Sequence, residues 1–169
     1  MKKWLIAIGG LIVLAVGVVI WMNQNYFYTP FSYPDGVVAE HTYSFKDFKK
    51  PVSIYVEKRD FSSSDTPYLY SKRMTDEEVV GELLGHLDRA KEVEDLIDPD
   101  AVYDESSIQY RVFVLGNLYE GRDRQLFVMH YGEDQDSFHI ETNRYFELTP
   151  EFKNSLQEAY QTVEWNPWP

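Results

Sequence analysis

An uninterrupted apolar segment near the N-terminus constrains this chain more than any other feature. Residues Trp4 to Met22 contain no charged, amide or hydroxyl side chain, and they directly follow Lys2 and Lys3. Nineteen such residues in an α-helix extend about 28 Å, close to the ~30 Å hydrocarbon core of a bilayer. A helix pairs its own backbone N–H and C=O groups, so the segment is able to span lipid. The sequence therefore predicts a transmembrane helix over residues 4–22.

Two other kinds of N-terminal signal fit this segment less well. A cleaved signal peptide has a shorter apolar core, of about 7–15 residues, and small residues just before the cut. The nearest candidate, Ala15-Val16-Gly17, lies inside the apolar run, and a lipoprotein signal needs a cysteine that the chain lacks. Trp4 and Trp21 stand at the two ends, where indole rings favour the headgroup boundary. We interpret the segment as an uncleaved signal-anchor.

The basic residues predict the orientation of this anchor. Lys2 and Lys3 precede it, and the next basic residue is Lys46. The positive-inside rule then keeps the N-terminus in the cytoplasm and exports the rest of the chain. We expect a single-pass protein of the cell membrane with four parts: a cytoplasmic stub (1–3), the transmembrane helix (4–22), a juxtamembrane linker (23–36) and one extracytoplasmic domain (37–169).

The composition of the exported part excludes some partners. Without Lys2 and Lys3, 14 of the 16 basic residues remain against 28 acidic residues, a net charge of −14. Such a charge argues against binding to nucleic acid or to anionic lipid. The absence of cysteine excludes disulfides, thiol catalysis and cysteine-bound metals. A disulfide-free exported domain suggests a bacterium, and more specifically one with a single membrane.

Alternation and turn signals predict an α+β domain beyond the linker. In the linker, Pro30 and Pro34 forbid regular structure, and its aromatic residues either form a membrane-interface belt or pack onto the domain. Apolar periodicity predicts strands at 37–45, 52–56, 68–73, 107–115, 125–131, 137–142 and 144–148. It predicts one helix over 76–93, with Thr75 and Glu78 as a capping box, and another from Thr149 and Pro150. Short connections favour an antiparallel sheet with two helices on one face.

A hairpin near the C-terminus carries the sharpest local constellation. If Met129 opposes Ile140, then His130 opposes His139 on the other face of the sheet, beside Glu141. Two histidines and a carboxylate are able to hold a transition metal. Surface histidines without a metal are the simpler interpretation, and we predict no metal site and no cofactor.

Other polar clusters lack the spacing of known sites. Acidic residues near Glu133, Asp134 and Asp136, and between Asp95 and Asp104, do not follow the calcium-loop pattern. Ser62, Ser63 and Ser64 do not lie in a nucleophile elbow. We therefore assign no catalytic, cofactor-binding or metal-binding residue and expect a domain that is not an enzyme.

Two segments resemble known proteins. The stretch from Thr75 to Lys91, followed by strands and by Tyr145 to Pro150, resembles small exported proteins of Gram-positive bacteria, either lipoproteins or single-pass anchored proteins. That resemblance implies location and architecture, and it implies no site. The expected function is a membrane-tethered domain that binds or modulates an envelope protein. The alternatives are a small-ligand or cation-binding domain and, less favoured, an envelope hydrolase.

Overall fold

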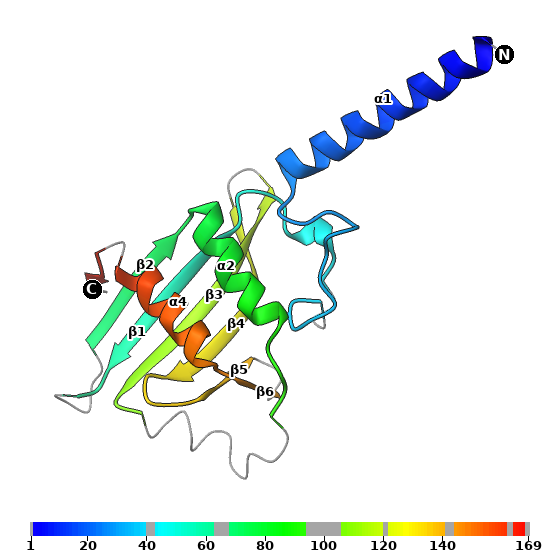
Figure 1. The fold of residues 1–169 in the computed structure, drawn as a ribbon. Coiled ribbons are helices and arrows are strands. Elements are labelled where there is room, and N and C mark those ends of the chain that lie inside the picture. The colour runs from blue at the N-terminus through cyan, green and yellow to red at the C-terminus, as the bar shows by residue number, and fades with distance from the viewer. Residues whose placement is uncertain are drawn as a thin grey trace.

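The apolar N-terminal segment forms one continuous helix that projects away from the rest of the chain (Figure 1). This computed structural model describes residues 2–39, 43–62, 68–93, 106–119, 122–140, 144–161 and 164–167. Helix α1 spans Lys2–Asn25. Within it, Ile6–Asn25 has a mean hydropathy of 2.3 and buries none of its apolar stretch inside the molecule. Its length and composition are compatible with a membrane anchor or a signal sequence.

The remainder is an α+β domain built on an antiparallel sheet, as the alternating patterns predicted. The sheet has seven strands, and the short edge strand β7 was not predicted. The strands lie in the order β6-β5-β4-β3-β1-β2-β7, so hairpins account for most neighbours. Their bounds are β1 Ser53–Asp60, β2 Tyr68–Met74, β3 Ile108–Tyr119, β4 Arg122–Gly132, β5 Ser137–Ile140, β6 Arg144–Glu147 and β7 Asn166–Pro167.

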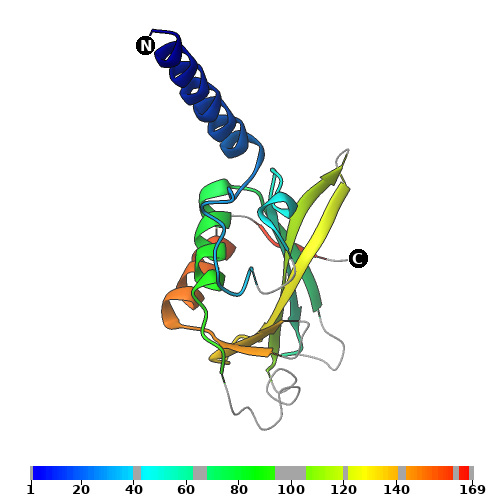
Figure 2. The same ribbon diagram turned by 90° about the vertical axis from the view of Figure 1, so that its right-hand side faces the viewer.

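Two helices, α2 (Glu77–Asp88) and α4 (Pro150–Gln161), lie side by side on one face of the sheet (Figures 1 and 2). The core fills the space between these helices and the sheet. The strands contribute every second residue to this core, because successive strand residues point to opposite faces of the sheet. The helices contribute residues three or four positions apart, which lie on one face of a helix. The main contributors are Ile54, Val56, Val112, Val114, Phe127, Met129, Phe138, Ile140, Phe146, Val80, Leu83, Leu84, Leu87, Phe152 and Leu156. The opposite face of the sheet carries neither helix, and we call it the helix-free face.

The start of α4 follows the sequence prediction, but the start and the end of α2 do not. The Thr149 hydroxyl accepts a hydrogen bond from the Phe152 amide at 3.2 Å, which confirms the predicted N-cap. In α2 the N-cap is Asp76, whose carboxylate accepts from the amides of residues 78 and 79, so the predicted capping box at Thr75 is wrong. A carboxylate is an equally good cap and also matches the helix dipole.

Helix α2 ends at Asp88, earlier than the predicted residue 93. Residues 91–93 instead run beside β6: the Val93 amide donates to the Tyr145 carbonyl at 2.8 Å, and the Glu147 amide donates to the Lys91 carbonyl at 2.9 Å. Pairing with a sheet edge replaces the helical hydrogen bonds that these residues would otherwise make. Tertiary contacts thus override the local helical pattern at this end.

The segment after α1 is held against the domain by backbone contacts, which we call the clasp. The Phe27 amide donates to the Phe48 carbonyl at 2.8 Å, and the Lys50 amide donates to the Asn25 carbonyl at 2.9 Å. Tyr28 is buried, whereas Phe31 is 91% exposed. Of the two roles considered for these aromatic residues, packing onto the domain accounts for Phe27 and Tyr28. It does not account for Phe31.

The strand predicted at 37–45 is absent from the described part of that range. Residues 37–39 form a turn, with the Ala39 amide donating to the Gly36 carbonyl at 2.9 Å, and Phe45–Asp47 form the short 3-10 helix η1. Val37 and Val38 are adjacent in sequence and both buried. Consecutive residues of a strand point to opposite faces, so only an irregular backbone brings both valines into one core. A side chain at Gly36 would collide with the Asp88 carbonyl, which explains the glycine there.

Candidate functional site

A continuous polar row crosses the helix-free face. Register pairs Glu57 of β1 with Arg111 of β3, Arg111 with His130 of β4, His130 with His139 of β5, and His139 with Tyr145 of β6. Cross-strand partners on one face lie within contact distance. The antiparallel ladder therefore brings together five side chains that are far apart in sequence, and this row is the centre of the candidate site.

The predicted hairpin register is confirmed, because Met129 pairs with Ile140 and His130 pairs with His139. The two imidazole rings stack with centroids 4.7 Å apart and planes inclined by 5°. Burial lowers the pKa of His130 to about 4, and the nearby positive charges of His139 and Arg111 add to this effect. His130 is thus neutral at physiological pH and half-buried rather than fully solvated.

The stacked geometry is unsuited to a shared metal ion. An imidazole nitrogen donates its lone pair within the ring plane, and two parallel, separated planes have no common point for an ion. Glu141, the third predicted neighbour, lies outside the described residues. Among the residues that the structure does describe, no group of three histidine or carboxylate side chains is arranged to hold a metal.

A cavity of about 220 Å³ opens beside the Glu57 end of the row. Its lining consists of Glu57, Arg59, Leu69, Tyr70 and Arg111. Arg111 Nη1 lies 3.3 Å from Glu57 Oε2, a long contact for an ion pair, and its guanidinium also lies 5.2 Å from the Phe113 ring centre. The Nε atoms of Arg59 and Arg111 are both buried and have no hydrogen-bond partner in the described part of the chain.

Sequence reasoning missed this cavity, although part of its signal was present. Residues 52–60 alternate, and the face opposite Val52, Ile54 and Val56 carries Tyr55, Glu57 and Arg59 in succession. Arg111 occupies the same kind of position in the next long strand. The sequence could have placed these charges on one face, but not the cavity between them.

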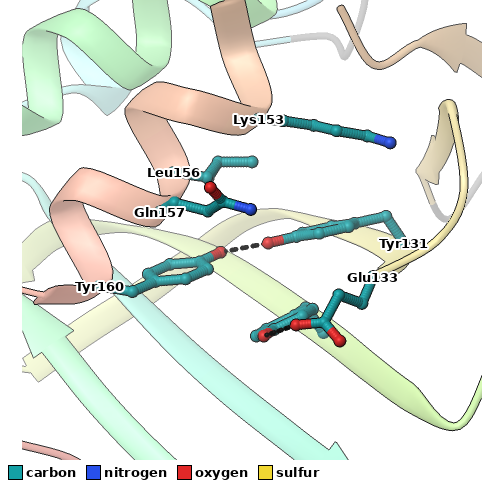
Figure 3. Close-up of a pocket in the computed structure, with 7 residues that line it drawn as sticks. Tyr131, Glu133, Lys153, Leu156, Gln157 and Tyr160 are labelled. Atoms are coloured by element: carbon teal, nitrogen blue, oxygen red, sulfur yellow. Dashed lines mark hydrogen bonds between the residues drawn. The ribbon is translucent and has the colours of Figure 1, made fainter. Parts of the chain in front are cut away.

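A second polar group lies under α4, where Tyr131 and Tyr160 face each other (Figure 3) and Tyr110 lines the same small cavity. The hydroxyls of Tyr131 and Tyr160 are 2.6 Å apart, and the Tyr110 hydroxyl donates to Glu133 at 3.4 Å. Burial raises the pKa of each of the three phenols. The adjoining cavity measures only about 30 Å³, room for about one water molecule. Each of these hydroxyls has a partner within the domain and the rings fill the core, so we assign the three tyrosines a structural role.

A third group joins the two helices through Ser155. His86 Nε2 lies 3.0 Å from Ser155 Oγ, and Ser155 Oγ donates to Glu82 Oε1 at 2.7 Å. In a serine nucleophile the histidine accepts the hydroxyl proton and the carboxylate orients the histidine. Here the carboxylate takes the serine proton directly, and His86 stacks on Phe152. No spacing in the sequence indicated this contact, and its geometry is that of a link between the two helices.

The remaining predicted features have structural partners or lie outside the described residues. In the acidic turn after β4, Asp134 accepts from Ser106, and Asp136 pairs with Lys153 at 2.7 Å. Ser62 donates to Asp60 at 2.6 Å. Ser63, Ser64 and residues 95–104 are not among the described residues.

No protein-family model, curated protein or solved structure matches this chain.

Proposed function

We propose that this chain is a single-pass membrane protein whose extracytoplasmic domain is a non-enzymatic binding module for an envelope partner. Residues 4–22 would cross the bilayer, with the N-terminus in the cytoplasm. Support comes from the apolar, fully exposed surface of α1 and from the two lysines that precede it. In this arrangement the clasp holds the domain close to the membrane surface.

The observation that carries the binding role is the cavity on the helix-free face. Helices α2 and α4 already cover one face of the sheet (Figure 2). The other face presents charged side chains around the cavity. Concave sites with a few convergent polar groups are the usual form of ligand sites. The same cavity favours the alternative of a small-ligand domain, and its two arginines disfavour the alternative of a cation binder.

Cysteine labelling tests the topology, because the chain has no cysteine of its own. A Glu158→Cys variant, on the exposed side of α4, should react with a membrane-impermeant maleimide in intact cells. A cysteine inserted after Met1 should react only after the membrane is permeabilised. Labelling in the reverse order, or a mature chain that begins beyond residue 15, would contradict the proposal.

Photocrosslinking tests which face binds. A benzophenone amino acid at Tyr55, on the helix-free face, should give an adduct of defined mass in living cells. The same group at Glu158, on the outer side of α4, serves as the matched control and should give none. Equal adducts from both positions, or none from Tyr55, would refute binding through this face.

A further inference from the structure

The charges that line the cavity on the helix-free face are unbalanced. Arg59 and Arg111 contribute two positive charges and Glu57 contributes one negative charge, which leaves one net positive charge. Arg111 shares the glutamate through a long contact, 3.3 Å from Nη1 to Oε2. No carboxylate among the described residues pairs with Arg59, whose Nε is buried without a hydrogen bond.

An unpaired guanidinium is unexpected in this protein. The chain has 28 acidic residues and a net charge of −12, so a carboxylate partner would be easy to supply from the chain itself. A buried donor without a partner costs roughly 1–3 kcal/mol, and more when it is charged. Both donors belong to side chains that line one cavity, and unsatisfied groups of this kind indicate a site prepared for an acceptor that comes from outside the chain.

The shape and the net charge of the cavity restrict that acceptor. A guanidinium presents parallel N–H donors that match the two oxygens of a carboxylate or the oxygens of a phosphate. One net positive charge is neutralised by one negative charge, and Glu57 in the lining repels a second. Leu69, which lies opposite Arg59 on this face, is the apolar side chain of the lining. The volume of about 220 Å³ is below that of sites for drug-sized ligands.

We infer that this cavity binds a carboxylate group attached to a small apolar or aromatic moiety, with Arg59 and Arg111 holding the carboxylate and Leu69 contacting the apolar part. This inference rests on the proposed binding role and specifies its chemistry. The carboxylate belongs either to a free small acid or to the last residue of a peptide chain. Both sources present the same group, and the experiment distinguishes them.

Calorimetric titration of the full chain in detergent micelles provides the test. The probes are phenylacetate, its uncharged analogue phenylacetamide, the dianion phenyl phosphate, and the peptide N-acetyl-Ala-Phe with either a free or an amidated C-terminus. Phenylacetate should bind more tightly than phenylacetamide and than phenyl phosphate. If the free peptide binds more tightly than phenylacetate and its amide does not bind, the source is a chain end. If the peptide binds no better, the source is a small acid.

Arg59→Gln should weaken carboxylate binding by roughly tenfold or more, because it removes charge-assisted hydrogen bonds. Arg73→Gln is the matched control: it lies on the same face, pairs with Asp123 at 2.7 Å and does not line the cavity, so the affinity should stay unchanged. Nitrogen-15 spectra should show the Arg59 and Arg111 Nε signals shifting on addition of phenylacetate, with the Arg73 signal fixed.

Equal affinity for phenylacetate and phenylacetamide, or equal weakening by Arg59→Gln and Arg73→Gln, would overturn the inference. Tighter binding of phenyl phosphate would also overturn it, in favour of a phosphate site. A failure here combined with a specific adduct from Tyr55 in cells would leave the binding face in place and refute only the carboxylate. Absence of both would refute the proposed function as well.

Discussion

Truncation of Leu84 tests the core beneath α2. Its side chain is fully buried in the core cluster. Replacing leucine with alanine removes the equivalent of three methylene groups, which at about 0.8 kcal/mol each amounts to ~2.4 kcal/mol of lost burial. A residual cavity adds to this loss because the packed neighbours relax only in part. We expect Leu84→Ala to lower the free energy of unfolding of the domain by about 3–4 kcal/mol.

Urea unfolding of the full chain in detergent micelles, followed by tryptophan fluorescence, measures this loss. Trp165 contacts the core residue Tyr160 with ring centroids 5.6 Å apart, so its emission should report the opening of the domain. Glu158→Ala, on the exposed side of α4, is the control and should change the free energy by at most about 0.5 kcal/mol. A loss below about 1 kcal/mol for Leu84→Ala, with an unchanged denaturant slope, would refute the burial of this helix face.

Three further predictions concern a helix cap, a buried acid and the histidine pair. Asp76→Ala should destabilise the domain by about 0.5–2 kcal/mol in the same urea assay, because two amides of α2 lose their acceptor. Burial raises the pKa of Asp88 to about 6, above its unfolded value of about 3.9. The protonated carboxyl therefore contributes its full share to the stability of the domain below the unfolded pKa, and this contribution is lost as pH rises through the folded pKa. Asp88→Asn should therefore be more stable than the parent above that range and equal to it in acid; a stabilisation that is the same at every pH would contradict this. Zinc titration should show no binding tighter than roughly micromolar, and submicromolar binding that His130→Ala abolishes would overturn our view of the stacked histidines.

The parts of the fold that were predictable are those in which local pattern and tertiary structure agree. The hairpin register followed from alternating apolar residues around a short turn, because a slip of one residue would expose Met129 and Ile140. The cap at Thr149 followed from a hydroxyl residue just before a proline. The turn at Val37 and Val38 had no such local signal, since only contacts with the domain decide that both side chains enter the core.

The candidate site was harder to predict because it depends on strand order. Glu57 and Arg111 are neighbours only because β3 pairs with β1 across an intervening helix and a strand. Alternation places each charge on a face of its own strand, but it does not specify which strand lies beside it. The contact between His86 and Ser155 likewise requires the packing of α2 on α4, which no spacing in the sequence encodes.

The clasp has a mechanical consequence for the domain in the proposed arrangement, in which α1 spans the bilayer. Hydrogen bonds at Asn25 and Phe27 join the end of α1 to residues 48–50, which lie a few residues before the start of β1 at Ser53. Rotation of α1 about its own axis would therefore rotate the sheet by the same angle. The cavity would then move in a circle about the axis of α1 and would not sample all orientations. A membrane protein that binds one side of α1 would then determine the direction, within the plane of the membrane, in which the cavity faces.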